Sequence, residues 1–200
     1  MQSHSEDLRI CFIGDSFVAG VGDETALGWT GRLLARSAQA GRPATGYNLG
    51  IRRNTSTDIR ARLRDEIERR RPADTELRLV FSFGVNDATA TDDGPRVPAA
   101  TSRENLIDCL DAAAGAPVLF VGPPPVHDEE HNHRILLLNN NFRDICDARC
   151  CTFVDVFTAL EKHDVWRRQV RDGDGAHPRS DGYTALFELV APAWDEWLRR

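Results

Sequence analysis

Short apolar runs recur along the chain, and most are followed by a stretch in which apolar residues return at helical spacing. The short runs predict buried strands and the spaced patterns predict amphipathic helices. We expect strands at residues 8–13, 44–49, 77–83, 117–122 and 152–156. Helices are expected near residues 29–40, 55–71, 101–113, 129–148 and from 180 onward, with short helical pieces in 157–170 and a loop at 91–98.

Strands that alternate with helices imply a parallel sheet covered on both faces. Two hundred residues with 41% hydrophobic content fit one globular domain over residues 1–200. In the first helical pattern, Trp29 and Leu33 lie on one side, and Arg32 and Arg36 lie on the other. The fold class is therefore α/β.

A Gly-Asp-Ser turn follows the first predicted strand and ends at Ser16. Gly14 gives the backbone freedom to turn sharply, which places Ser16 at the carboxyl edge of the sheet, where ligands bind in open α/β folds. A serine there can act as a nucleophile if a base lies beside it. The alternative is that Asp15 or Ser16 merely caps the next helix.

Three later segments carry the other residue types that acyl transfer needs. His177 is a candidate base and Asp174 would orient its ring. The backbone N–H groups of Ser16 and Gly50 and the side-chain amide of Asn86 are candidate donors for an oxyanion hole. Asn86 has an alternative interpretation, as a turn residue that stabilises its own loop.

These segments resemble the motif blocks of the SGNH hydrolases, the GDSL family of esterases and lipases. The matching residues, spread from Ile10 to the last helix, are Gly14-Asp15-Ser16 with Gly20, then Gly50, Gly84-Val85-Asn86-Asp87, and Asp174 with His177. Phe17 stands where the family name has leucine. The resemblance implies a three-layer α/β/α, flavodoxin-like fold with a five-stranded parallel sheet in the order 2-1-3-4-5.

The composition narrows the class of partner. A net charge of -6 and a pI near 5.5 disfavour nucleic acid and anionic membranes. No apolar run approaches the roughly 20 residues of a membrane span, and residues 1–7 do not resemble a signal peptide. Five cysteines without regular spacing do not form a secreted disulfide framework. We expect a cytoplasmic protein, and the sequence leaves its oligomeric state open.

Two polar segments keep alternatives open. The segment His127–His133 holds three histidines and three carboxylates, which suits a metal ion but also an acidic helix start; we expect no metal and a loop that walls the substrate pocket. Arg52 and Arg53 either meet an acidic group on the substrate or lie in a solvated loop.

The residues together predict a serine hydrolase that cleaves carboxylic esters or thioesters of small molecules through Ser16, His177 and Asp174, without a cofactor. A deacetylase or lysophospholipase would use the same site. The alternative from another class is a binding module on the same fold that holds a small molecule without turning it over.

Overall fold

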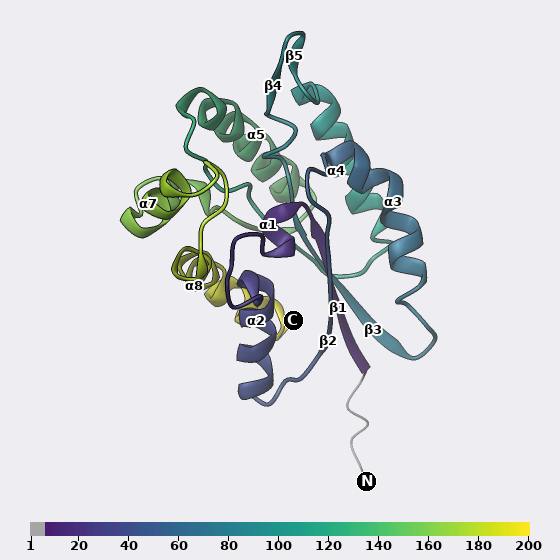
Figure 1. Ribbon diagram of the computed structural model, residues 1–200. Coiled ribbons are helices and arrows are strands. Elements are labelled where there is room, and N and C mark those ends of the chain that lie inside the picture. Colours follow the sequence, from purple (N-terminus) through teal and green to yellow (C-terminus); the bar gives the residue numbers. More distant parts are fainter. Residues whose placement is uncertain (1–6) are drawn as a thin grey trace.

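The computed structural model describes residues 7–200, so the expectation of no signal peptide in residues 1–7 falls almost wholly outside it. A five-stranded parallel sheet forms the centre, in the order β2-β1-β3-β6-β7 (Figure 1). This order confirms the predicted 2-1-3-4-5 arrangement. The strands are β1 (Asp7–Gly14), β2 (Thr45–Gly50), β3 (Thr75–Ser82), β6 (Val118–Val121) and β7 (Thr152–Val154).

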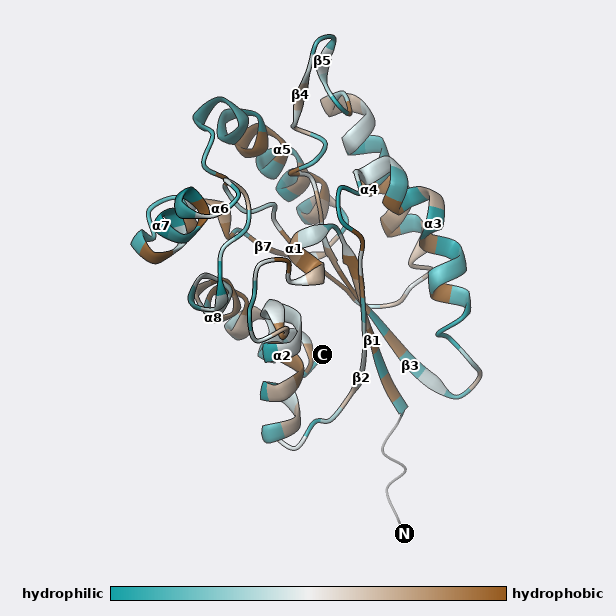
Figure 2. Cartoon of the chain, viewed as in Figure 1, coloured by the Kyte–Doolittle hydropathy of each residue, from teal (hydrophilic) through white to brown (hydrophobic). Residues whose placement is uncertain are grey.

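Helices cover both faces of the sheet. On one face α2 packs against α8, and on the other α4 packs between α3 and α5 (Figure 1). Their apolar sides face the sheet and their polar sides face outward, as the colouring of Figure 2 shows. The bounds are α2 (Gly28–Gln39), α3 (Ser56–Glu68), α4 (Ala99–Ala112), α5 (Glu129–Ala148) and α8 (Ser180–Trp197).

The core is built on β1, whose residues Ile10 to Ile13 are fully buried. Phe12 stacks on Trp194 of α8 with ring centroids 5.6 Å apart and meets Trp29 of α2 edge-on at 5.9 Å. Aromatic pairs of this kind add to the free energy of area burial. The first strand and the last helix therefore share one packing layer.

The ends of β1, β2 and β3 lie level with one another. Gly14 pairs with Gly50 on one side and with Ser82 on the other. A Cβ atom at Gly14 would lie 2.0 Å from the Ser82 carbonyl oxygen, so only glycine fits there. Because the three strands end together, the segments that follow them meet at one edge of the sheet.

Two predictions about the middle of the chain are wrong in detail. Residues 91–98 are not a plain loop, since Ala90–Thr91 (β4) and Gly94–Pro95 (β5) form a small antiparallel hairpin. Helix α4 begins at Ala99 after Pro98, whereas the sequence suggested a cap at Thr101 or Ser102. The Ser102 hydroxyl instead donates to Asp87, at 2.9 Å. The predicted bounds of α5 are confirmed.

Arg32 of α2 forms a buried ion pair. Its guanidinium reaches back from α2 to the loop before that helix and lies 2.5 Å from the Asp23 carboxylate, whose side chain is 0% exposed. It also donates to the Ser180 hydroxyl at the start of α8, at 2.8 Å. We call Asp23, Arg32 and Ser180 the brace. It ties the loop that follows Ser16 to the segment that follows His177.

Two short helices, α6 (Phe157–Leu160) and α7 (Asp164–Asp172), lead from β7 to the loop before α8. All five cysteines are free thiols, and Cys11, Cys109 and Cys146 are buried. Within residues 7–200, no helix has both the length and the apolar character needed to cross a bilayer.

Candidate active site

Ser16 lies at the turn that leaves β1 and is the first residue of the short helix α1 (Ser16–Ala19). Asp15 caps this helix by accepting the Phe17 N–H at 2.9 Å, so the capping alternative holds for Asp15. Gly20 ends the helix with a φ of 76°, a conformation that favours glycine. Ser16 is 6% exposed, at the carboxyl edge of the sheet.

The loop between α7 and α8 brings His177 to Ser16, a residue 161 positions away in the chain. His177 Nε2 lies 2.7 Å from Ser16 Oγ, and Nδ1 lies 2.7 Å from Asp174 Oδ2. Because a carboxylate only accepts hydrogen bonds, Nδ1 carries the proton and Nε2 is the acceptor for the serine hydroxyl. The structure thus joins Ser16, His177 and Asp174 in one chain of hydrogen bonds.

Asp174 is held by the backbone as well as by the ring. Its Oδ1 accepts the N–H groups of Ala176 at 3.0 Å and His177 at 2.8 Å. Burial acts to raise the pKa of Asp174, but the hydrogen bonds from His177 and Ala176 outweigh it and lower the pKa to about 2. The carboxylate is therefore ionised at neutral pH and able to stabilise a cationic imidazole.

Aromatic packing fixes the plane of the imidazole. The Phe17 ring lies 4.9 Å from the His177 ring, centroid to centroid, and stacks at 6.3 Å on Trp166 of α7. The Trp166 indole N–H in turn donates to the Pro125 carbonyl at 3.0 Å. Phe17, where the family name has leucine, thus joins the serine turn to the histidine.

Gly50 does not border the cavity beside Ser16. Its backbone N–H donates to Asn48 Oδ1 at 3.0 Å. A Cβ atom at Gly50 would lie 2.2 Å from the Ala19 nitrogen. The glycine is required at this position because β2 ends directly against α1, and its role as an oxyanion donor stays a prediction.

Asn86 follows β3 and does reach the cavity beside Ser16. Its amide nitrogen donates to the Asn54 carbonyl at 3.0 Å and to Asp15 Oδ2 at 3.2 Å, so both amide hydrogens are engaged. Burial raises the pKa of Asp15 to about 7, although the Phe17 N–H opposes the shift. The contact with Asp15 is the longer of the two and weakens when that carboxyl is protonated.

In the sequence, Asp87 stood out only as part of a motif and Arg62 had no assigned role, yet both stabilise this edge of the sheet. Asp87 is fully buried and accepts hydrogen bonds from the backbone and side chain of Ser56 and from Ser102. Arg62 donates to the carbonyls of Gly14 at 3.1 Å and Leu49 at 2.8 Å, which end β1 and β2. By its spacing, Arg62 lies on the polar side of its helix. The sequence pattern therefore gave no reason to treat it differently from the neighbouring charged residues.

A cavity of about 190 Å³ opens beside Ser16 and His177. Asp128 and His131 of the segment predicted to wall the substrate pocket border this cavity, as does Val126 just before that segment. From Glu129 onward, however, the segment is the start of α5 and not a loop. His131 Nε2 is engaged with the Val85 carbonyl at 2.8 Å.

Among residues 7–200, no group of three or more His, Cys, Asp or Glu side chains lies close enough to hold a metal ion. Arg52 and Arg53 are exposed and do not border the cavity, as the solvated-loop alternative expects.

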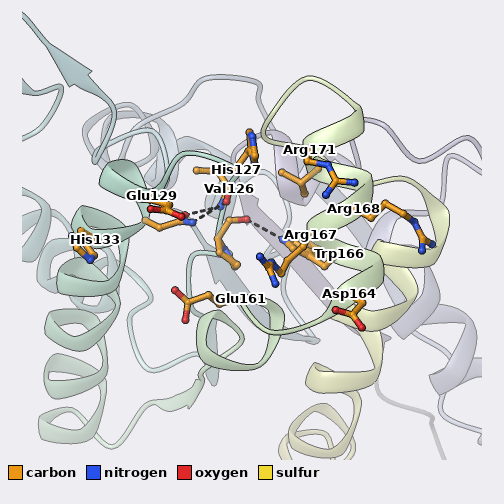
Figure 3. A pocket seen from close by; sticks show the side chains of 13 residues that line it. Val126, His127, Glu129, His133, Glu161, Asp164, Trp166, Arg167, Arg168 and Arg171 are labelled. Atoms are coloured by element: carbon orange, nitrogen blue, oxygen red, sulfur yellow. Dashed lines mark hydrogen bonds between the residues drawn. The ribbon is translucent and has the colours of Figure 1, made fainter.

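A larger hollow of about 520 Å³ lies between the start of α5 and helix α7 (Figure 3). Glu129 and His133 border it on one side and Arg167 and Arg171 on the other. It shares Val126 with the smaller cavity but contains neither Ser16 nor His177. The smaller cavity is therefore the candidate active site, since Ser16 and His177 border it.

Solved structures share this fold across nearly the whole chain. A lipase/acylhydrolase from Enterococcus faecalis has 24% identity and a TM-score of 0.74, covering 92% of this chain and 94% of its own. A G-D-S-L family lipolytic protein from Veillonella parvula has 17% identity, a TM-score of 0.75 and coverage of 94% and 98%. An acetylxylan esterase from Geobacillus stearothermophilus has 16% identity, a TM-score of 0.73 and coverage of 94% and 95%.

No curated protein matches the sequence. The model of the GDSL-like lipase/acylhydrolase family matches residues 12–185, which include the serine turn at one end and the histidine loop at the other. This match covers most of the chain. The sheet order and the segments at the strand ends agree with it. The protein belongs to the GDSL-like lipase/acylhydrolase family.

Proposed function

We propose that this protein hydrolyses carboxylic esters of small molecules through an acyl-enzyme on Ser16. The observation that carries the proposal is the continuous chain of 2.7 Å contacts from Ser16 Oγ through His177 to Asp174. A serine hydroxyl is a weak nucleophile at its free pKa, and an adjacent base that takes its proton activates it.

In the first half-reaction, Ser16 Oγ bonds to the ester carbonyl carbon while His177 Nε2 takes the hydroxyl proton. Asp174 stabilises the imidazolium that forms. The tetrahedral intermediate then collapses, the bond from carbon to the alcohol oxygen breaks, and the alcohol leaves with the proton from Nε2. Ser16 now carries the acyl group as an ester.

In the second half-reaction, water attacks the acyl carbon while His177 Nε2 takes one of its protons. The bond to Ser16 Oγ breaks, the serine regains the proton, and the carboxylic acid leaves. No cofactor takes part in this scheme. The same two steps cleave a thioester, with a thiol as the leaving group.

The oxyanion of each intermediate needs donors. The first N–H groups of a helix have no acceptor within that helix, and the Ser16 N–H has no hydrogen-bond acceptor among residues 7–200. Asn86 supplies a second donor if its amide shares or releases the 3.2 Å bond to Asp15. Gly50, the third predicted donor, has its N–H engaged with Asn48 Oδ1 at 3.0 Å.

The test is hydrolysis of p-nitrophenyl acetate by the wild-type protein and by Ser16→Ala. We expect the variant to fold normally and lose activity, because a small hydroxyl contributes little to packing. A fluorophosphonate should modify the wild-type protein at Ser16 alone. Labelling of another serine, or full activity in Ser16→Ala, would contradict the assignment.

A binding module without catalysis is the second candidate, and the same assay separates the two. A binding module has no use for a base within 2.7 Å of a serine hydroxyl. A deacetylase or lysophospholipase would be a specialisation of the same site.

We also propose a reducing, cytoplasmic location on the evidence of five unpaired cysteines. Cell fractionation with a thiol-reactive reagent tests this location.

A further inference from the structure

The cavity beside Ser16 is small for a ligand site. Its volume of about 190 Å³ lies below the roughly 300–1,000 Å³ usual for drug-sized ligands. The leaving alcohol must lie at His177 Nε2, from which it takes its proton. Val85, Thr89, Val126 and His131 form one wall of the cavity into which the acyl group must fit.

The part of this wall that comes from α5 is bonded to the end of β3. His131 Nε2 donates to the Val85 carbonyl at 2.8 Å, directly before Asn86. One turn along the same helix, Arg134 Nε donates to the Ala88 carbonyl at 2.8 Å. These two bonds prevent α5 from moving away from the serine without breaking buried or half-buried contacts.

Val126 is fixed even more firmly. Its N–H donates to Asn132 Oδ1 and its carbonyl accepts from Asn132 Nδ2, both at 2.8 Å. The next residue, His127, donates its N–H to the Gly175 carbonyl in the catalytic loop, at 2.9 Å. Pro123, Pro124 and Pro125 precede this segment and have fixed φ angles. The wall has little freedom to widen.

We propose that this fixed wall restricts the enzyme to esters of short acyl groups, of about two to four carbons. The proposal rests on the proposed function and adds the substrate class. A small cavity with a wall held in this way rejects longer chains, because added methylenes do not fit against that wall without displacing the bonded backbone. One methylene in a fitted apolar pocket changes kcat/KM by roughly 10–200-fold.

The experiment measures kcat/KM for p-nitrophenyl esters with acyl chains of two, four, six and eight carbons. We expect the acetyl and butyryl esters to be cleaved at least tenfold faster than the octanoyl ester. A parallel series of acetate esters with alcohols of rising length should vary less, because under this proposal the alcohol does not enter the space that the fixed wall limits.

Two variants test whether the fixed wall causes the restriction on acyl length. Asn132→Ala removes both bonds to Val126 and should lower the acetyl-to-octanoyl ratio of kcat/KM at least threefold. Val126→Ala enlarges the cavity directly and should act in the same direction, which keeps the test valid if Asn132→Ala folds poorly. Asn140→Ala is the matched control, because Asn140 is exposed on the same helix and does not border the cavity; its ratio should equal that of the wild type.

The outcomes separate this proposal from the proposed function. If the wild-type protein is labelled at Ser16 but cleaves the octanoyl ester as fast as the acetyl ester, the acyl restriction is wrong and the hydrolase assignment stands. An unchanged ratio in both Asn132→Ala and Val126→Ala also overturns it. If no ester is cleaved and the fluorophosphonate does not react, both proposals fail.

Discussion

The brace of Asp23, Arg32 and Ser180 predicts a measurable loss of stability when its charge is removed. Asp23 accepts hydrogen bonds from Arg32 at 2.5 Å and from the Gly28 N–H at 2.8 Å. Burial acts to raise the pKa of Asp23, but these bonds and those from Thr25 lower it from 3.8 to about 2. A shift of this size corresponds to about 2 kcal/mol of folding free energy.

We therefore expect Asp23→Asn to lower the free energy of unfolding by about 2 kcal/mol at pH 7. For a chain of this length that lowers Tm by roughly 4–8 °C. Because the pKa of Asp23 is depressed in the folded state, its contribution is complete above about pH 4 and is lost as the pH falls through 2. Urea titrations at pH 7, 5, 4 and 3 should show the wild type and variant converging at the acid end.

Asp195→Asn is the matched control. Arg36 and Asp195 join the same two helices, α2 and α8, at 2.6 Å, but their side chains are 45% and 31% exposed. Water and salt screen such a pair, so we expect a cost of at most about 1 kcal/mol. Equal losses in the two variants would refute the argument, since burial would not decide the outcome.

The brace also has a consequence for catalysis. Ser180 is three residues from His177, and its N–H donates to the Glu24 carboxylate at 3.0 Å. Loss of the brace loosens the segment that carries the base. We expect kcat for p-nitrophenyl acetate, per folded molecule, to fall in Asp23→Asn and to remain at the wild-type value in Asp195→Asn.

Three further predictions concern single positions. Asp174→Asn should lower kcat by roughly 10⁴-fold with the fold unchanged, because the ring then holds the wrong tautomer; steady-state kinetics and circular dichroism check both halves. Asn86→Ala should lower kcat by about 10²–10³-fold with little change in KM, whereas a residue that only stabilises its turn would lower Tm and leave kcat intact. Asp87→Ala should cost at least about 3 kcal/mol of stability in urea titrations, because it leaves the buried Ser56 and Ser102 groups without an acceptor.

The sequence predicted the strands well, because strands buried on both faces appear as continuous apolar runs, whereas the strand order was predicted from the family resemblance. The pattern that placed α5 at Glu129–Ala148 succeeded for a similar reason, since Ile135, Leu138 and Phe142 recur on one buried face. The segments that end β1 and β3 were also found, since glycine and polar residues directly after an apolar run are a local signal. Local patterns therefore located Ser16 and Asn86.

Local sequence patterns could not predict contacts between residues that are far apart in the chain. Arg32 occupies an outward helical position by spacing, but its long side chain returns to Asp23 in the preceding loop. Gly50 follows a strand as a catalytic glycine would, yet it is required by the close approach of α1. The spacing of residues predicts which side of a helix or strand a residue lies on. It does not predict which distant residues that side contacts.

The wide separation of Ser16 and His177 sets the order in which activity arises during synthesis. Ser16 and β1 leave the ribosome early, and His177 follows 161 residues later, which takes roughly 10–30 s at common translation rates. Under the proposed mechanism, a nascent chain carries an unactivated serine until α8 docks against α2 and Trp194 reaches Phe12. Hydrolysis through the proposed mechanism would then report that the last helix has been made and packed.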